Sequence, residues 1–302
     1  RYLRAKQPID DRALNVPVWQ RLTVELADLP GPYLHVLEIG AGIGTMIERT
    51  LIRGLFPDHI VNVNYTALDA DGTLLEALPA TLSRAAERCG WGYETTEAGG
   101  LLQPGGQRIA VTGLETDVVR WAMEQQAGQY DLLIAHAFLD LLDVPVVLPS
   151  LMDLLRPGGL FYLSLNFDGI TAFEPEIDLA LDHQIEELYH RSMDERTING
   201  KPSGDHRAGR HLLTQVREAG AEVLAAGSSD WVVFADGHSS YPGDEQYFLY
   251  HILRFVEETL SGHPELDPSA FREWLYRRRQ QVERGEMTYV AHQLDLCGRG
   301  SA

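Results

Sequence analysis

The sequence predicts an α/β protein with a mostly parallel sheet and helices on both faces. Two observations carry this prediction. An apolar strand pattern over residues 35–39 runs into a glycine turn at residues 40–44, and apolar residues at helical spacing follow at once. The same order of strand, loop and helix then recurs along the chain as far as about residue 219. This alternation is typical of doubly wound sheets, in which each helix returns the chain to a parallel strand.

The predicted elements follow this rhythm in order. Further strands are expected at residues 65–68, 108–112, 131–135 and 160–165. Helices are expected at residues 45–51, 74–85, 118–123, 147–155 and 209–219. Two strands, 221–225 and 231–235, close the series, and the short Gly-Ser-Ser-Asp link between them predicts an antiparallel hairpin.

The chain is expected to divide into three parts. Residues 1–34 form an N-terminal helical cover, with a helix around residues 8–27. Residues 35–236 form the α/β domain, interrupted at about residues 168–208 by an acidic insertion that contains a helix near 177–192. Residues 237–302 form a mainly helical C-terminal extension, which is helical around 244–260 and 269–284 and strand-like at 288–294.

The charge balance restricts the partners that the sequence predicts. The 302 residues include 25 Lys and Arg against 44 Asp and Glu, which gives a formal net charge of −19. Such a field repels phosphate backbones and anionic membrane surfaces. No segment has the run of about 18 apolar residues that a membrane-spanning helix requires. We therefore expect neither nucleic acid nor a membrane as a partner.

The cysteines indicate a reducing compartment. Cys89 and Cys297 lie far apart in the sequence with no second cysteine near either, so neither a disulfide framework nor a zinc site is expected. The segment Arg1–Arg4 is not followed by an apolar run, so no signal peptide is expected, and the missing initiator Met indicates a trimmed chain. These features predict a cytoplasmic location.

The glycine turn has the composition of a ligand-binding loop. Gly40, Gly42 and Gly44 allow a sharp turn and a close approach of the backbone to a ligand at a helix N-terminus. A dinucleotide fingerprint requires its third glycine at the position that Thr45 occupies here. Glu38, two residues before the first glycine, favours a ligand with an ammonium group over a pyrophosphate.

Four motifs in order resemble the class I S-adenosylmethionine-dependent methyltransferases. Val-Leu-Glu-Ile-Gly-Ala-Gly-Ile-Gly at residues 36–44 resembles the first motif of that family, and Asp69 matches its ribose-binding acid. Residues 130–134 resemble the motif of the fourth strand, and residues 154–159 resemble the turn before the fifth. The resemblance covers about residues 35–235 and implies a seven-stranded sheet whose last strand is antiparallel.

The resemblance implies that S-adenosylmethionine binds at the carboxyl ends of the first strands. The family often places Asp or Asn after the third strand to meet the adenine amino group, but residues 112–115 here read Thr-Gly-Leu-Glu. Adenine recognition is therefore assigned to the backbone of Leu114 or the side chain of Glu115. The residues assigned to the cofactor are Glu38, Gly40, Ala41, Gly42, Gly44, Asp69, Ala70, Leu114, Glu115 and His136.

His136 is the candidate catalytic residue. It follows the strand at 131–135, and in the resembling family residues just after this strand lie beside the transferred methyl group. Because imidazole titrates near neutrality, His136 suits a general base that takes a proton from the acceptor. The alternative is that His136 only packs against the cofactor or bonds to the backbone, with Phe138 as an apolar wall in either case.

Other polar clusters are expected to be structural. His183, Glu187 and His190 share one helix face and could ligate a metal, but a solvated face is the better interpretation, so no metal site is predicted. The run Arg277–Arg279 is expected to be solvated surface, and Asp205–His206 a plain loop pair.

The sequence thus predicts a methyltransferase that acts on a small-molecule acceptor by O- or N-methylation, with in-line transfer from S-adenosylmethionine. Covers at residues 8–27 and 168–208 would enclose such an acceptor, and the acidic charge favours it over RNA or DNA. A nicotinamide-dependent oxidoreductase remains the enzyme alternative, and a binding protein that has lost catalysis the non-enzyme one. The sequence carries no signal for an oligomeric state.

Overall fold

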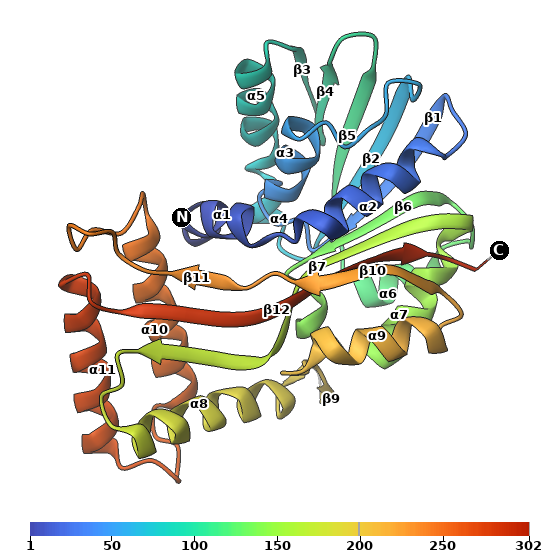
Figure 1. Ribbon diagram of the computed structural model, residues 1–302. Helices are drawn as coiled ribbons and strands as arrows, with labels where there is room; N and C mark the ends of the chain where they lie inside the picture. Colours follow the sequence, from blue (N-terminus) through green and yellow to red (C-terminus); the bar gives the residue numbers. More distant parts are fainter. Residues whose placement is uncertain (199, 302) are drawn as a thin grey trace.

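The computed structural model describes residues 1–198 and 200–301, which form a sheet flanked by helices (Figure 1). The helices are α1 (Tyr2–Ala13), α2 (Val16–Ala27), α3 (Thr45–Ile52), α4 (Gly72–Leu75), α5 (Leu78–Cys89), α6 (Val118–Glu124), the 3-10 turn η1 (Leu139–Leu141), α7 (Val144–Asp153), α8 (Leu179–Asp194), α9 (Ala208–Glu218), α10 (Glu245–Leu260) and α11 (Pro268–Glu283). The strands are β1 (Tyr33–Ile39), β2 (Asn62–Asp69), β3 (Gly92–Thr96), β4 (Gly99–Gln103), β5 (Arg108–Glu115), β6 (Tyr130–His136), β7 (Leu155–Glu174), β8 (Thr197–Ile198), β9 (Lys201–Pro202), β10 (Glu222–Ser228), β11 (Trp231–Val233) and β12 (Thr288–Arg299).

The main sheet confirms the predicted α/β fold class with parallel central strands, but it does not have the expected number of seven strands. Within the described residues it has ten strands in the order β10-β12-β7-β6-β1-β2-β5-β4-β3, with β11 also paired to β12. The central strands β7, β6, β1, β2 and β5 are parallel. Antiparallel strands complete both edges, including a hairpin of β3 and β4 in a glycine-rich stretch where no strand was expected. The carboxyl ends of the parallel strands therefore meet at one edge, where ligands bind in open α/β sheets.

The predicted hairpin between residues 221–225 and 231–235 is wrong. Strands β10 and β11 both pair antiparallel with β12, where Glu222 lies opposite Arg299 and Trp231 lies opposite Ala291. The link between them continues along β12 because Ser229 N–H donates to the Gln293 carbonyl oxygen at 2.9 Å. The antiparallel last strand that the resemblance implies is therefore residues 288–299, between β7 and β10.

The expected boundary at residue 236 needs the same correction. Because β12 completes the sheet, the α/β unit reaches Arg299. Helices α10 and α11 are thus an insertion before the last strand, and not an extension beyond it. The acidic segment 168–208 also begins inside the sheet, since β7 continues to Glu174 and pairs there with Thr288 of β12.

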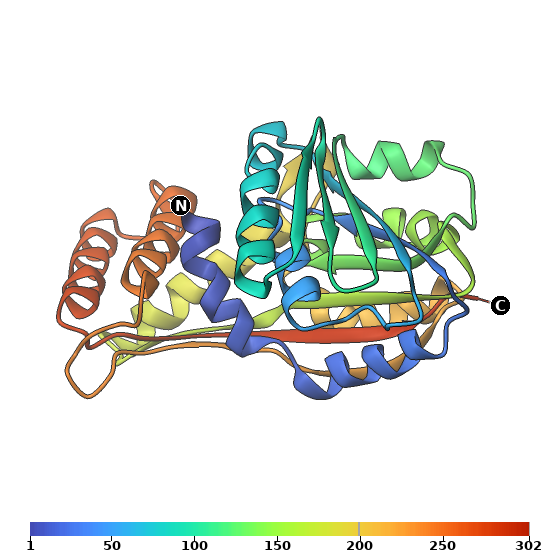
Figure 2. The same ribbon diagram turned by 90° about the horizontal axis from the view of Figure 1, so that it is seen from above.

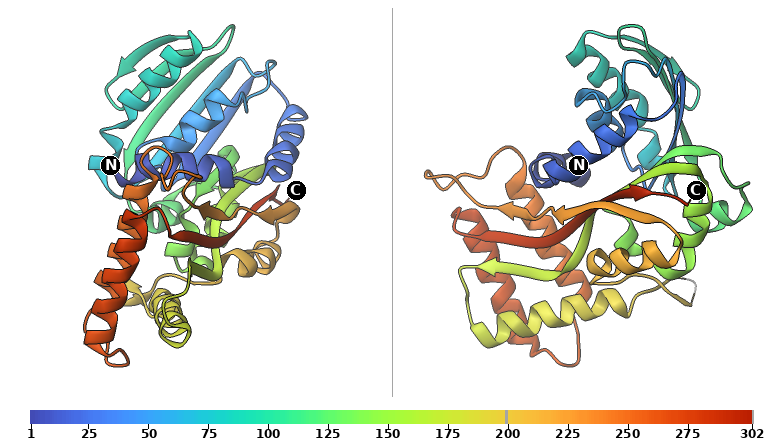
Figure 3. Two further views of the ribbon diagram at one scale, coloured as in Figure 1. Left: turned by 60° about the vertical axis from the view of Figure 1, so that its left-hand side comes forward. Right: turned by 45° about the vertical axis from the view of Figure 1, so that its right-hand side comes forward.

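The ends of β7 and β12 carry a separate group of helices. Helices α8, α10 and α11 pack with these strand ends around a second apolar core, which includes Phe173, Phe248, Trp274 and Tyr289. The two views of Figure 3 place these helices at the opposite end of the molecule from the β3–β4 hairpin. Two other apolar cores fill the two faces of the main sheet.

The basic run is solvated surface only in part, because Arg277 is exposed as expected but Arg278 is not. The Arg278 side chain is fully buried, and its Nη2 lies 2.7 Å from Oδ1 of Asp182 in α8. Its position follows from helical spacing, because Trp274, Arg278 and Val282 share the buried face of α11. Neighbouring Arg279 pairs with Glu257 of α10.

The N-terminal cover consists of two helices and not one. The chain turns at Asn15, whose side-chain Oδ1 accepts from Val18 N–H at 3.0 Å and caps α2, with Pro17 in the first turn. Helix α2 packs on β7, β10 and β12, whereas α1 contacts α3, α10 and β11. Figure 2 shows α1 between α10 and the part formed by α3 and α5.

Truncation tests the position of β12. A chain that ends after Asp236 lacks the strand between β7 and β10 and is expected not to fold, because both strands lose their shared partner. Circular dichroism and thermal unfolding measure this, with a chain ending after Arg299 as the control that should unfold cooperatively. Cooperative unfolding of the 1–236 chain would show that the α/β domain is complete without β12.

Candidate active site

The glycine turn between β1 and α3 has the backbone that only glycine adopts easily. Gly40, Gly42 and Gly44 have φ angles of 68°, 54° and 80°. A Cβ atom on Gly40 would lie 2.3 Å from the ring of Phe138, so this position also has no room for a side chain. Ala41 N–H donates to the Leu68 carbonyl oxygen at 2.9 Å, which fixes the turn to the end of β2.

Two cavities open on either side of this turn. The first, here called the α1 cavity, has a volume of about 740 Å³ and is lined by α1, the glycine turn, and parts of β7, α8, α10 and β12. The second, the α6 cavity, has a volume of about 890 Å³ and is lined by the end of β2, by α6, by the segment between β6 and α7, and by the start of α7. Both are lined by Gly40, Asp69, Leu141 and Arg196, so the two cavities meet at the turn.

Asp69, the predicted ribose-binding acid, lies at this junction. Its Oδ2 accepts from Gly42 N–H at 2.7 Å, and its Oδ1 accepts from Asp71 N–H at 2.9 Å. These backbone donors hold the carboxylate between the glycine turn and α4. Ala70 lines the α6 cavity beside it.

Glu38 is buried under the glycine turn and lines the α1 cavity. Its Oε2 accepts a hydrogen bond from the Tyr65 hydroxyl at 2.6 Å. Burial, together with the nearby Asp69 carboxylate, raises the pKa of Glu38 to about 8, although the Tyr65 hydroxyl and Arg49 act in the opposite direction. A cationic ligand group beside Glu38 would favour the ionised form.

The residues predicted to contact adenine do not line either cavity. Among the described residues that line the two cavities, neither Leu114 nor Glu115 is present, and the α6 cavity is lined instead by Thr116, Asp117 and Val118. The Glu115 carboxylate lies against Gly72, where a Cβ atom would be 2.2 Å from it. Asp117 caps α6 by accepting from Arg120 N–H at 3.0 Å, and this N-cap pattern was the signal available in the sequence.

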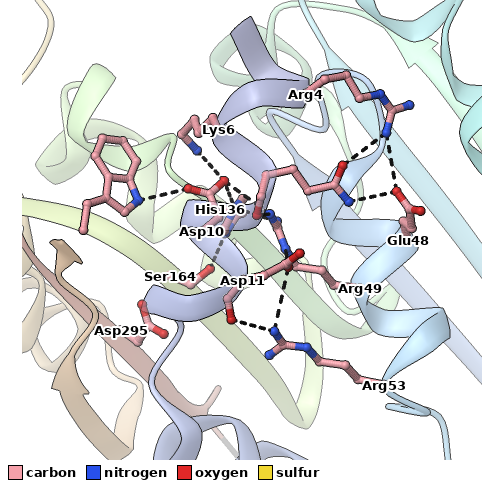
Figure 4. A network of polar contacts seen from close by, with 12 residues as sticks. Arg4, Lys6, Asp10, Asp11, Glu48, Arg49, Arg53, His136, Ser164 and Asp295 are labelled. Atoms are coloured by element: carbon pink, nitrogen blue, oxygen red, sulfur yellow. Dashed lines mark hydrogen bonds and ion pairs between the residues drawn. The ribbon is translucent and has the colours of Figure 1, made fainter. Parts of the chain in front are cut away.

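His136 lines the α1 cavity as expected, but both of its ring nitrogens are bonded to protein groups. Nε2 lies 2.8 Å from Arg49 Nη1, and Nδ1 lies 2.8 Å from the Ser164 hydroxyl (Figure 4). Nε2 also lies 3.2 Å from Asp10 Oδ2, which can only accept, whereas the Arg49 guanidinium can only donate; the shorter contact indicates that Nε2 accepts from Arg49 and that Nδ1 carries the ring proton. Burial and the Arg49 charge lower the pKa of His136 to about 3. This geometry leaves no free lone pair for an acceptor proton.

The residues that hold His136 were missed in the sequence. Asp10 of α1 accepts from Lys6 at 2.7 Å, from Arg49 of α3 at 3.3 Å and from the Trp231 indole at 3.0 Å. Burial alone would raise the pKa of Asp10, but Lys6, His136 and Arg49 together lower it below its ordinary value. The network in Figure 4 thus ties α1 to α3, β6 and β11. Its one local signal is the i, i+4 spacing of Lys6 and Asp10.

The histidine face of α8 does not form a shared ligand set. His190 lies 3.0 Å from the Thr171 hydroxyl, and its ring stacks on His206. In the part of the chain that the structure describes, the group spaced closely enough to hold an ion is Asp194, Asp205 and His206. His206 Nδ1 already lies 2.7 Å from an oxygen of Asp194, so these two side chains of the loop cluster are bonded to each other.

Comparison with known proteins supports the fold. No protein-family model matches the chain, and no curated protein matches it in sequence. A candidate methyltransferase from Bacillus halodurans C-125 matches in structure with a TM-score of 0.50 and 13% identity, over 94% of this chain and 99% of the other. The YcgJ protein from Bacillus subtilis matches with a TM-score of 0.45 and 12% identity, over 94% of this chain and 98% of the other.

The chain therefore has the Rossmann-like fold of the class I methyltransferases, which confirms the resemblance at the level of the fold. Among the described residues, no helix combines the length and apolar character needed to span a membrane.

Glu38 should make stability depend on pH. Its pKa is about 8 in the folded chain against an ordinary value of 4.5, so the folded state binds a proton more tightly. Its contribution is fully present below pH 4.5 and falls as the pH rises through about 8. The stability of wild type relative to Glu38→Gln should therefore decrease across this window, as measured by thermal unfolding. Glu94→Gln, at an exposed position of β3, is the control, and a pH-independent difference for Glu38→Gln would contradict the burial argument.

Proposed function

We propose that this protein binds S-adenosylmethionine and transfers its methyl group to a small-molecule acceptor by O- or N-methylation. The observation that carries the proposal is the glycine turn, which opens onto two joined cavities with Asp69 at their junction. A ligand of two unlike halves, joined near Gly40, fits such a pair of cavities.

The residues around the turn fit the chemistry of that cofactor. The absence of a Cβ atom at Gly40 lets the backbone approach the ligand, and Glu38 offers a carboxyl group for an ammonium. The Asp69 carboxylate can accept from ribose hydroxyls, and Thr116, Val118 and neighbouring apolar side chains would hold the adenine in the α6 cavity. When bound, S-adenosylmethionine supplies an electrophilic methyl group on its sulfonium.

The chain itself then has to position the acceptor and exclude water. Helix α1 covers the first cavity through Tyr2, Leu3 and Lys6, and the Asp10 network holds this cover in place. Ordering the acceptor beside the turn supplies the alignment that in-line transfer needs, and the cover keeps the site dry.

A small acceptor is favoured over nucleic acid, and a cytoplasmic location is part of the proposal. The net charge is −19, and the basic run that a phosphate backbone could have used is broken by the burial of Arg278. The free thiols of Cys89 and Cys297 agree with a reducing compartment.

Replacing Asp69 tests the cofactor site. Asp69→Ala removes a charge-assisted hydrogen bond to the ribose and should weaken binding of S-adenosylmethionine and S-adenosylhomocysteine by about 1.5–3 kcal/mol. Calorimetry measures this, with Asp71→Ala, which removes the cap of α4, as the control. Unchanged affinity in Asp69→Ala would remove Asp69 from the site. Binding of NAD without S-adenosylmethionine would support an oxidoreductase, and binding without turnover on any acceptor would support a protein that has lost catalysis.

Replacing His136 distinguishes a base from a positioning residue. We propose that His136 orients Arg49 beneath α1, because both its nitrogens are already bonded. His136→Ala should then keep kcat within a few-fold and lower the free energy of unfolding by about 1–3 kcal/mol, since Arg49 loses a buried acceptor. A loss of about 10²–10⁴-fold in kcat with unchanged cofactor affinity would identify His136 as the general base instead.

A further inference from the structure

The α1 cavity extends beyond the glycine turn into a space with aromatic walls. These walls come from α1, β7, β11, β12, α8 and α10, so they combine the main sheet with the helices packed on the ends of β7 and β12. The aromatic side chains that line it are Tyr2, Phe167, Tyr189, Trp231, Phe255 and Tyr289. If the cofactor occupies the turn, as proposed above, this space is where the acceptor lies.

Two polar side chains that line the α1 cavity, one from η1 and one from β12, have a buried oxygen without a partner. Oδ1 of Asp140 and Oε1 of Gln293 are buried and accept no hydrogen bond from the described residues, and both side chains line the cavity. A buried acceptor without a partner has lost its hydrogen bond to water, so most such groups in folded proteins are paired. A ligand that donates hydrogen bonds would satisfy both oxygens.

The charged side chains that line the cavity also favour a ligand that donates hydrogen bonds. Lys6 is already paired with Asp10 at 2.7 Å and stands over the Trp231 ring. Arg196 is an exposed residue that lines both cavities. Burial raises the pKa of Asp140 to about 6, and Asp205 adds to this while Lys6 and Arg196 oppose it. Asp140 is therefore ionised at neutral pH and can only accept.

We propose that the methyl acceptor is an amine on an aromatic or apolar body, whose N–H groups donate to Asp140 and Gln293. This inference rests on the proposed function and specifies its substrate class. An ammonium or amine has enough donors for both oxygens, and the aromatic walls stabilise a nearby cation. An alcohol offers a single donor, and a carboxylate would be repelled by Asp140.

In the proposed transfer, the Asp140 carboxylate accepts the proton that the acceptor nitrogen loses. The acceptor binds as an ammonium, and its nitrogen gives up one proton to the Asp140 carboxylate, which leaves a lone pair on nitrogen. That lone pair forms the new nitrogen–carbon bond, while the methyl–sulfur bond breaks and its electron pair stays on sulfur. The products are the methylated ammonium and neutral S-adenosylhomocysteine, and the proton on Asp140 returns to solvent when they leave.

A matched panel tests the substrate class by binding as well as by turnover. Sets of amine, alcohol and carboxylate on one skeleton, beginning with 2-phenylethylamine, 2-phenylethanol and phenylacetate and extending to larger and smaller skeletons, are titrated into protein saturated with S-adenosylhomocysteine. The same sets are then assayed for methylation with S-adenosylmethionine. We expect the bound and methylated members to be amines. Preference for an alcohol or a carboxylate over its matched amine, or a panel in which no amine binds, overturns the proposal.

Variants identify the groups responsible. Asp140→Asn keeps the shape but removes the charge, and it should weaken amine binding at least about tenfold while S-adenosylhomocysteine affinity is unchanged. Gln293→Leu should weaken it less, and Asp153→Asn, exposed on α7, is the control. Unchanged amine affinity in Asp140→Asn overturns the assignment of that residue. If S-adenosylhomocysteine itself fails to bind the wild-type protein, it is the proposed function that fails, so the two failures are distinguishable.

Discussion

The pairing of β7 with β12 is the interaction on which the rest of the molecule depends. It runs from Leu160 opposite Arg299 to Glu174 opposite Thr288. One half of this pair closes the main sheet beside β6, and the other half carries the helices α8, α10 and α11. Because the same two strands continue through both parts, one hydrogen-bonded ladder connects the main sheet to the aromatic walls of the α1 cavity.

The second constraint is the buried charge network beneath α1. Lys6, Asp10, Arg49 and His136 are buried, and buried ionised groups are tolerated only if each is paired. These ion pairs and hydrogen bonds form only when α1 is in its correct position. The network therefore both stabilises the fold and fixes the position of α1. Both ring nitrogens of His136 are used in this network, whereas Asp140, which also lines the α1 cavity, has a buried oxygen without a partner among the described residues.

The sequence predicted the parts that depend on local patterns. The central strands, the glycine turn and Asp69 lie where the periodicity and the motifs placed them. The partner of β10 could not be predicted, since β12 follows it only after two intervening helices, and the short link to β11 is equally typical of a hairpin. Likewise, Asp10 reaches His136 from the other end of the chain, and the burial of Arg278 depends on Asp182 from a helix far away in sequence. Such pairings are decided by tertiary packing.

The central claim is that one cofactor spans the two cavities that meet at Gly40. A crystal structure of the protein with S-adenosylhomocysteine tests it most directly. We expect adenine density in the α6 cavity near Thr116 and Val118. The ribose should lie against Asp69, and the homocysteine part should lie beside Glu38 and Gly40. Density for the ligand in neither cavity, or with the adenine in the α1 cavity among the aromatic walls, would contradict it.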